Sequence, residues 1–260
     1  MYAFDFERPS TVAEAVAALK TEEAQALGGG QTLIPTLKQR LASPSKLVSL
    51  GGIAEMKGIS SAGGVVTIGA GTTHAEVAAS GAIPALSALA GGIGDPAVRN
   101  RGTIGGSLAN NDPAACYPSA ALALGATIVT NAREIAADDF FEGLFTTALE
   151  EGEIITAVKF PVPEAANYQK FEQPASRFAL VGVFVAKTGG GVRVAVTGAS
   201  EDGVFRWSDA EAALAGDFSA GALEGMAPSA DGMIGDLHGT KEYRAHLVGV
   251  MTKRAIAAAA

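Results

Sequence analysis

Two glycine-rich segments have the residue types and spacing that suit the binding of a phosphate-bearing ligand. The first is Gly28 to Gly30, which follows a short apolar stretch, and the second is Gly102 to Ser107. Glycine permits positive φ and lets a ligand approach the main chain, and successive N–H groups in such a turn form a concave anion site. Neither 27–34 nor 102–111 contains Lys or Arg, so a bound diphosphate would depend on backbone amides and on the hydroxyls of Thr32, Thr103 and Ser107.

Taken alone, these turns fit no standard dinucleotide motif. The Gly-x-Gly-x-x-Gly pattern needs glycine at position 33 or 74, where the chain has Leu33 and His74, and the Gly-Lys-Ser/Thr ending of a P-loop is absent. Glycine also serves ordinary tight turns. The residues alone therefore leave a phosphate cradle and a plain pair of turns both open, and they do not predict a Rossmann or Walker site.

The chain has few residues that could bind a metal ion or act as a nucleophile. Cys116 is the only cysteine, and the three histidines are scattered along the sequence. An iron–sulfur cluster normally takes four Cys ligands, and structural zinc draws heavily on Cys and His. No Ser–His–Asp or paired-carboxylate arrangement can be assigned. We therefore expect no metal site and no catalytic residue, and we expect any iron–sulfur cluster to lie on another chain.

Composition narrows the class of partner. The chain has 260 residues, 48% of them hydrophobic and 18% charged, which is typical of a compact globular protein. Its net charge of −8 argues against nucleic acid as the main partner, because phosphate-backbone binding needs clustered Lys and Arg. No apolar stretch reaches the roughly 18 residues of a membrane span, and no secretory signal is visible. The sequence therefore predicts a cytoplasmic protein.

The first 60 residues predict a small parallel α/β unit around the first glycine turn. Residues 11–20 show helical spacing of apolar residues, and Thr11 and Glu14 form a capping-box pair at the start. A strand over 24–27 leads into the glycines, and a strand over 46–50 follows a second helix. That second helix is expected to turn three residues inward, namely Leu33, Leu37 and Leu41.

A second subdomain and a C-terminal domain are expected beyond residue 60. The second subdomain comprises strands over 65–71, 127–130 and 153–160, helices capped at 73–76 and over 83–92 and 118–124, and a long segment over 95–113. The C-terminal part comprises strands over 178–187 and 191–199 and helices from about 209 and over 243–257. Pro161 to Pro163 is the expected boundary. The predicted fold is α+β, with an N-terminal domain at 1–163 (subdomains about 1–60 and 61–163) and a C-terminal domain of antiparallel sheet with helices at 164–260.

Both glycine segments resemble the FAD motifs of one protein family. Residues 28–38, Gly-Gly-Gly-Gln-Thr-Leu-Ile-Pro-Thr-Leu-Lys, look like the first motif of the medium subunits of the carbon monoxide dehydrogenase and xanthine dehydrogenase family, the molybdenum hydroxylases. Residues 99–107, Arg-Asn-Arg-Gly-Thr-Ile-Gly-Gly-Ser, followed by Asn111-Asp112-Pro113, look like the second. Residues 68–72, 170–183 and 243–250 are also similar, so the resemblance covers essentially the whole chain.

The resemblance implies a fold and a set of cofactor-binding residues. Family members bind FAD in a vanillyl-alcohol-oxidase-type fold, in the groove between two N-terminal α/β subdomains, with a smaller C-terminal domain beside them. Lys170 matches a lysine near the polar edge of the flavin, Ile155 a residue packing near it, and Phe178 an aromatic close to it in some relatives. The residues implied at the cofactor are Leu27, Gly28, Gly29, Gly30, Gln31, Thr32, Leu33, Ile34, Gly102, Thr103, Ile104, Gly105, Gly106, Ser107, Asn110, Cys116, Ile155 and Lys170.

The chain departs from the family pattern at Cys116, where many relatives have an aspartate that hydrogen-bonds the cofactor. A thiol is a poor substitute for a carboxylate acceptor, so either Asp112 makes that contact or it is lost. Other conspicuous residues have structural interpretations. His74 is expected to be structural, Trp207 to lie at the surface or an interface, and Arg99 and Arg101 to anchor their loop by ion pairs.

The implied function is electron relay. In the family, a large molybdopterin subunit oxidises the substrate, and electrons pass through two [2Fe–2S] clusters of a small subunit to FAD and on to a quinone, NAD or dioxygen. The resemblance implies a dimer of heterotrimers, with the carbon-monoxide-dehydrogenase-like branch slightly favoured. Carbon monoxide, a purine or another N-heterocycle, and an aldehyde stay open as substrates. Two alternatives also stay open: a stand-alone FAD-dependent oxidase or reductase, and an interaction domain without cofactor.

Overall fold

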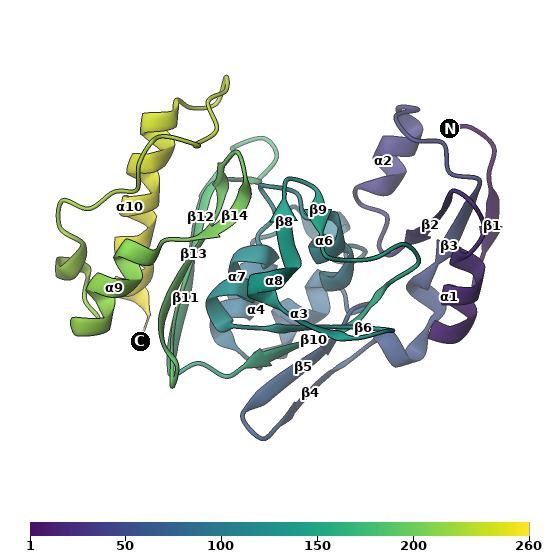
Figure 1. Ribbon diagram of the computed structural model, residues 1–260, viewed down its shortest axis with the longest axis horizontal. Coiled ribbons are helices and arrows are strands. Elements are labelled where there is room, and N and C mark those ends of the chain that lie inside the picture. The colour runs from purple at the N-terminus through teal and green to yellow at the C-terminus, as the bar shows by residue number, and fades with distance from the viewer. Residues whose placement is uncertain (260) are drawn as a thin grey trace.

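The computed structural model describes residues 1–259, and it begins with a parallel three-stranded sheet (Figure 1). This N-terminal lobe has the strand order β1-β3-β2, with both pairings parallel, which confirms the predicted parallel unit. Thr11 and Glu14 form the predicted capping box on the first helix. The elements are β1 (Asp5–Glu7), α1 (Val12–Leu19), β2 (Ala24–Leu27), α2 (Leu33–Lys38) and β3 (Lys46–Ser49).

A central lobe follows, built on an antiparallel sheet of order β4-β5-β10-β6-β7. Its strands are β4 (Ile59–Ala62), β5 (Val65–Gly69), β6 (Thr127–Thr130), β7 (Glu134–Ala136) and β10 (Ile155–Pro161). Its helices are α3 (His74–Ser80), α4 (Pro84–Gly91), α5 (Pro96–Arg99), α6 (Ile104–Asn110), α7 (Tyr117–Leu124) and α8 (Ala137–Phe140), besides the short 3-10 turns η1 (Leu50–Gly52) and η2 (Ala54–Met56). A small hairpin, β8 (Phe141–Gly143) and β9 (Thr146–Thr147), completes this lobe.

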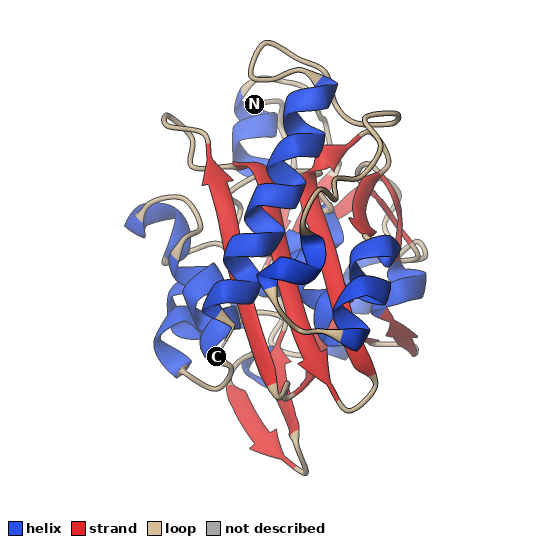
Figure 2. Cartoon of the chain, turned by 90° about the vertical axis from the view of Figure 1, so that its left-hand side faces the viewer, coloured by secondary structure: helices blue, strands red, loops and turns tan. Residues whose placement is uncertain are grey.

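The C-terminal sheet is antiparallel and covered by helices on both faces. Its strands run in sequence order, β11 (Ala165–Glu172), β12 (Ala179–Thr188), β13 (Gly191–Ser200) and β14 (Gly203–Arg206). Figure 2 shows the longest helix, α10 (Lys241–Ala258), lying across these strands, and α9 (Ser208–Gly216) and η3 (Ala220–Leu223) accompany it. On the other face, α7 packs against β12 and β13 (Figure 1).

Two hydrophobic cores meet at strand β12. Phe184 and Ala186 belong to the core that also contains the central lobe, whereas Val183 and Val185 belong to the core under α10. Alternate residues of a strand point to opposite faces, so β12 is buried on both sides, from residue 179 to 186. The C-terminal sheet therefore shares a continuous core with the central lobe.

The structure corrects several sequence-based expectations. Leu41, expected inward, follows the end of α2 and is 73% exposed, whereas Trp207, expected at the surface or an interface, is 4% exposed in the core under α10. The segment 95–113 contains two short helices, α5 and α6. The strands that were not predicted are β1, β4, β7, β8, β9, β11 and β14.

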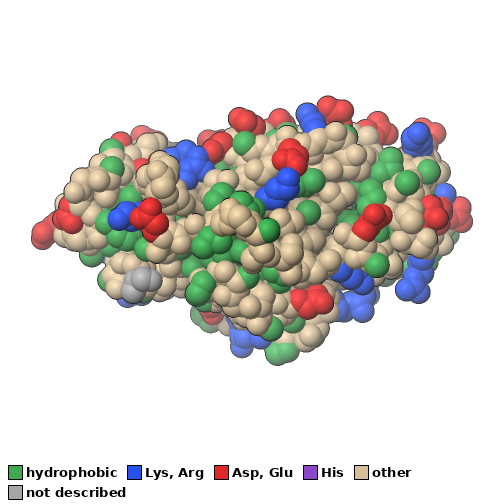
Figure 3. All heavy atoms as spheres, turned by 90° about the horizontal axis from the view of Figure 1, so that it is seen from below, with side chains coloured by type: hydrophobic (Ala, Val, Ile, Leu, Met, Phe, Trp, Pro, Cys, Tyr) green, Lys and Arg blue, Asp and Glu red, His purple; other side chains and the backbone are tan. Residues whose placement is uncertain are grey.

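The surface carries mixed charge. On the face seen in Figure 3, Lys and Arg side chains are interspersed with Asp and Glu. Within residues 1–259, no helix combines the length and the hydropathy that crossing a bilayer requires.

Candidate functional site

A deep cleft of about 1320 Å³ runs between the lobes. Its wall extends from Gln25 and Thr36 in the N-terminal lobe, past both glycine turns, to Lys170 and Phe178 beside the C-terminal sheet. Pockets for drug-sized ligands are usually about 300–1,000 Å³. The cleft is therefore large enough for an extended ligand of dinucleotide size.

The two glycine turns, about 75 residues apart in sequence, touch each other in this cleft. A Cβ built on Gly29 would lie 1.9 Å from the carbonyl oxygen of Arg101, and one built on Gly28 would lie 3.1 Å from Thr103 Oγ1. Gly30 has φ of 75°, which favours glycine. The first turn therefore needs glycine both to bend and to fit against the second turn.

The backbone amides of the first turn are free. Among the described residues, none accepts a hydrogen bond from the six successive N–H groups of 28–33, and the Thr32 side chain does not cap α2. Backbone N–H groups are strong donors, and all of these residues are half-buried or exposed and line the cleft. Six such donors along one wall suit the oxygens of a diphosphate.

The second turn differs from what its glycines predict. The N–H groups of Ile104 and Gly105 donate to the carbonyls of Thr72 and Ala70, at 3.1 and 2.9 Å. Those of Gly106 and Ser107 donate to the Thr103 hydroxyl and carbonyl, at 3.2 and 3.0 Å. Four of the main-chain amides of this turn, from Ile104 to Ser107, are therefore already used within the protein, and the Thr103 N–H is left without an acceptor among the described residues. Its glycines serve close packing, since a Cβ on Gly105 would lie 2.5 Å from Ala70 Cβ.

The structure brings most of the expected site residues to the cleft wall and leaves two behind it. Ile104 is fully buried in α6, and Ile34 packs under Gly30. These two side chains can support the turns but do not face the cleft. The expected residues that line it are Leu27, Gly28, Gly29, Gly30, Gln31, Thr32, Leu33, Gly102, Thr103, Gly105, Gly106, Ser107, Asn110, Cys116, Ile155 and Lys170.

Lys170 is a buried cation at the far end of the cleft. Its side chain is 5% exposed, and Nζ donates to the carbonyls of Gly92 and Arg177 at 2.7 and 2.8 Å. Glu172 lies 3.5 Å away at the surface. Lys170 is therefore not a solvated strand lysine. The ammonium group is fixed between segments that are distant in sequence.

Cys116 lies next to Lys170, with Sγ 3.9 Å from Nζ. Burial raises the pKa of the Cys116 thiol, and the charge of Lys170 opposes that rise only in part. The thiol thus stays protonated at neutral pH. Asp112, the possible replacement for the carboxylate of relatives, also lines the cleft but accepts a hydrogen bond from the Ala114 N–H at 2.8 Å.

Phe178 lies on the same rim and is 52% exposed, so it is not a core residue of β12. Sequence reasoning overlooked several other residues of the wall. Lys57, Arg177 and the exposed aromatic Phe145 all line the cleft. Arg177 lies within the segment 170–183 that resembles the family, which was the only signal pointing to it.

The two arginines beside the second turn behave differently from expectation. Arg99 anchors its loop, but through the carbonyls of Ile93 and Gly94 at 3.0 and 2.9 Å. Arg101 lines the cleft. Neither forms an ion pair within residues 1–259, so the predicted ion pairs are wrong.

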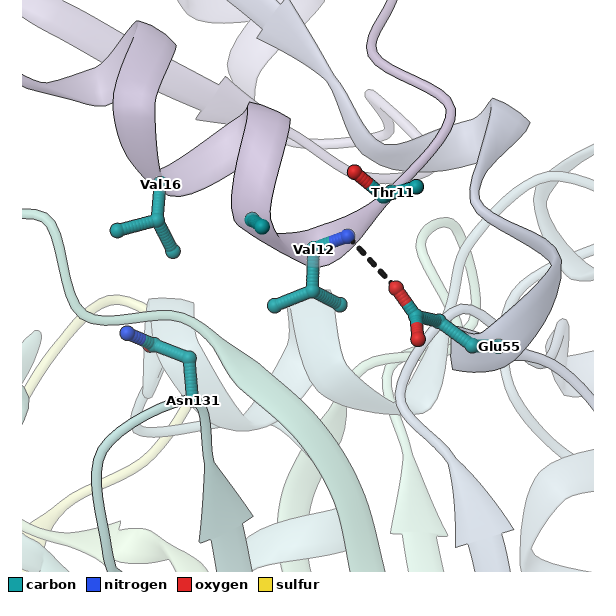
Figure 4. Close-up of a pocket in the computed structure, with 6 residues that line it drawn as sticks. Thr11, Val12, Val16, Glu55 and Asn131 are labelled. Atoms are coloured by element: carbon teal, nitrogen blue, oxygen red, sulfur yellow. Dashed lines mark hydrogen bonds between the residues drawn. The ribbon is translucent and has the colours of Figure 1, made fainter.

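A second, smaller hollow of about 640 Å³ shares no lining residue with the cleft. Figure 4 shows Val12 and Val16 of α1 facing it opposite Asn131, while Glu55 accepts a hydrogen bond from the Val12 N–H at 2.7 Å. No cluster of three or more His, Cys, Asp or Glu suited to a metal ion occurs in the part of the chain that the structure describes.

Comparison with known proteins defines the class. Residues 2–163 match the family described as "FAD binding domain in molybdopterin dehydrogenase". The part of the cleft at the two glycine turns fits such a cofactor, because the amides of 28–33 have no acceptor and the glycines carry no side chain. The class is therefore that of flavin-binding oxidoreductase subunits. Within it, the chain belongs to the FAD-binding medium subunits of the molybdenum hydroxylases, and its cofactor is FAD.

Relatives match along nearly the whole length. The carbon monoxide dehydrogenase medium chain of Afipia carboxidovorans is 35% identical, with 97% of this chain and 95% of the relative covered. The nicotine 6-hydroxylase medium subunit of Paenarthrobacter nicotinovorans is also 35% identical, covering 98% and 96%. The crystal structure of quinoline 2-oxidoreductase from Pseudomonas putida 86 superposes with a TM-score of 0.88 at 31% identity, covering 99% and 97%. These structural matches confirm the predicted fold class.

Proposed function

We propose that this chain relays electrons through FAD, from [2Fe–2S] clusters of a partner subunit to a final acceptor. The observation that supports this most directly is the run of six backbone N–H groups without an acceptor, in residues that line a dinucleotide-sized cleft. FAD, when bound, supplies a carrier that exchanges electrons one or two at a time. With one cysteine in the sequence, the chain lacks the ligands for a cluster of its own.

The chain's own residues hold and orient the cofactor. The amides of 28–33 grip the diphosphate, and Thr103, Ser107 and Asn110 contact the neighbouring sugar chain. Lys170, Ile155 and Cys116 lie at the flavin end. A fixed cation there favours electron density on the ring system. Because Lys170 is held by two carbonyls, its charge would be in place without rearrangement at a bound flavin.

The partners are a small [2Fe–2S] subunit and a large molybdopterin subunit, arranged as a dimer of heterotrimers. Relatives named as medium chains or medium subunits support a small and a large partner, while the dimer of heterotrimers follows only from the resemblance to the family. Substrate recognition would then reside in the large subunit, which leaves the substrate and the final acceptor open. A cytoplasmic location stays a prediction from the sequence.

We also propose that residues 1–163 form the FAD-binding domain, with subdomains about 1–60 and 61–163, and that 164–260 form the C-terminal domain. The change of sheet between β10 and β11 supports this division. The C-terminal sheet contributes Lys170 to the cleft, and β13 binds the adjoining segment through Thr197, whose hydroxyl contacts the carbonyls of Pro113 and Ala115 at 2.8 and 2.7 Å.

Isolation of the tagged chain from its native source tests the proposal. We expect FAD on the tagged chain, and iron and molybdenum on two chains that co-purify with it. Carbon monoxide, a purine, an N-heterocycle or an aldehyde should bleach the flavin in that complex, but not in the full chain alone loaded with FAD. An active protein free of iron and molybdenum would contradict the relay. Steady bleaching of the isolated chain by one of these substrates would support a stand-alone oxidase.

A further inference from the structure

His74, expected to be structural, lies at the cleft with no hydrogen-bond partner for its ring. It is the first residue of α3, whose start is fixed by the capping box of Thr73 and Glu76. Its own N–H donates to the Gly102 carbonyl at 2.9 Å, which holds the residue against the second turn. His74 lines the cleft although it is only 5% exposed.

Both ring nitrogens lack partners within residues 1–259. Nδ1 is buried without a hydrogen bond, and Nε2 lies so close to the second turn that a Cβ on Gly102 would come within 2.5 Å of it. The Tyr117 ring packs 5.3 Å away, and its buried hydroxyl also has no partner. Buried polar groups are nearly always hydrogen-bonded, so an orphaned imidazole beside a binding cleft needs an explanation.

The second turn is short of donors for an anionic ligand. Its N–H groups from Ile104 to Ser107 are already used within the protein. A diphosphate lying along the free amides of 28–33 would therefore meet no main-chain donor from 104–107 on its opposite side. His74 and Arg101 are the nitrogen-bearing side chains adjoining Gly102 on the cleft wall.

We propose that His74 is a cofactor-binding residue whose Nε2–H donates a hydrogen bond to a diphosphate oxygen of FAD. The inference rests on the proposed site and adds a side-chain donor to it. The imidazole is neutral, because burial and the nearby Arg99 guanidinium lower the pKa of His74 to about 4. With the proton on Nε2, the buried Nδ1 is an acceptor without a partner among the described residues.

Binding titrations of the full chain, freed of FAD, test this contact. The His74→Phe variant keeps a flat ring without a donor, and His74→Gln restores an N–H. Three ligands that contain different parts of the cofactor serve as probes: FAD itself, ADP, which has the diphosphate but no flavin, and riboflavin, which has the flavin but no phosphate. We expect His74→Phe to weaken FAD and ADP roughly 10- to 100-fold, as for loss of a hydrogen bond to a charged group. Riboflavin affinity should stay unchanged, and His74→Gln should recover most of the loss.

Two results would overturn the inference. Wild-type affinity of His74→Phe for ADP would show that the imidazole makes no contact. Equal loss for riboflavin and ADP would show that the ring only supports the wall. If the wild-type chain itself bound neither FAD nor ADP, the proposed site would fail along with the inference. A direct readout is the ¹⁵N spectrum of the three histidines, where ADP should shift only the His74 Nε2–H signal; an unmoved signal under saturation would also contradict the contact.

Discussion

The two ends of the cleft differ in that the main chain forms one and side chains form the other. One end, where we propose that the diphosphate binds, is made by the main chain of six consecutive residues, 28–33, whose N–H groups have no acceptor in the described chain. The other end, where we propose that the flavin lies, is made by side chains, with Lys170 fixed by the carbonyls of Gly92 and Arg177 and in contact with Cys116. The first end depends on the absence of side chains and the second on the position of one charge. Substitutions should therefore separate them.

The largest effect is expected at the junction of the turns. Gly29→Ala would place a methyl 1.9 Å from the Arg101 carbonyl oxygen, so the turns must move apart. FAD and ADP affinity should both fall by at least roughly 100-fold in titrations, which corresponds to about 3 kcal/mol. Gly189→Ala is the matched control, since no atom lies within 4 Å of a Cβ there. Unchanged ADP affinity in Gly29→Ala would mean that the diphosphate lies elsewhere.

Lowering the pH should reduce the free energy of unfolding through His74, which lies against the second turn. The pKa of His74 is lowered from 6.5 to about 4 in the folded state, so the unfolded chain takes up this proton first. The contribution of neutral His74 to the free energy of unfolding is fully present above pH 6.5. It is lost as pH falls toward 4, by about 3 kcal/mol. Urea unfolding between pH 7 and 4.5 should show the loss in wild type and not in His74→Phe. A second loss, from Glu153, begins only below pH 4.5, because its hydrogen-bonded ion pair with Arg133 lowers its pKa to about 2. Equal slopes for the two proteins above pH 4.5 would refute the assignment to His74.

Removal of the fixed charge should affect the flavin end alone. Lys170→Met leaves the carbonyls of Gly92 and Arg177 without their donor, which should cost about 2 kcal/mol of stability. Riboflavin and FAD should bind less tightly and the flavin potential should fall, while ADP affinity stays at the wild-type value. Lys170→Arg keeps the charge and serves as the control. A parallel loss of ADP affinity would show that the two ends are not separable.

The smallest effect is expected at Cys116. A thiol is a weak donor and acceptor, so Cys116→Ala should change FAD affinity by less than about threefold in the same titrations. Cys116→Asp introduces the carboxylate of relatives beside Lys170. The difference in FAD affinity between the two variants then gives the contribution of that carboxylate to binding. A loss beyond tenfold in Cys116→Ala would establish the thiol as a principal cofactor contact.

The difference between the two ends also explains what the sequence could predict. The first turn is local: strand, glycines and helix follow one another, so the pattern predicted its shape, whereas FAD was implied only by the resemblance to the family. The same pattern failed at Gly105, because whether an amide is free depends on Ala70, which lies on another segment. The burial of Lys170 could not be foreseen either. It depends on β11, a strand without regular hydrophobic alternation, and on carbonyls from 92 and 177.

Hydrogen–deuterium exchange of the full chain with and without FAD tests the central claim most directly, namely that the first turn holds the cofactor by its main chain. The amides of 28–33 have no acceptor in the protein and should exchange quickly until FAD is added. The account predicts strong protection of these six amides on binding, with little change in 104–107, whose amides are already hydrogen-bonded. Protection confined to 104–107, or no protection of 28–33 at saturating FAD, would contradict it.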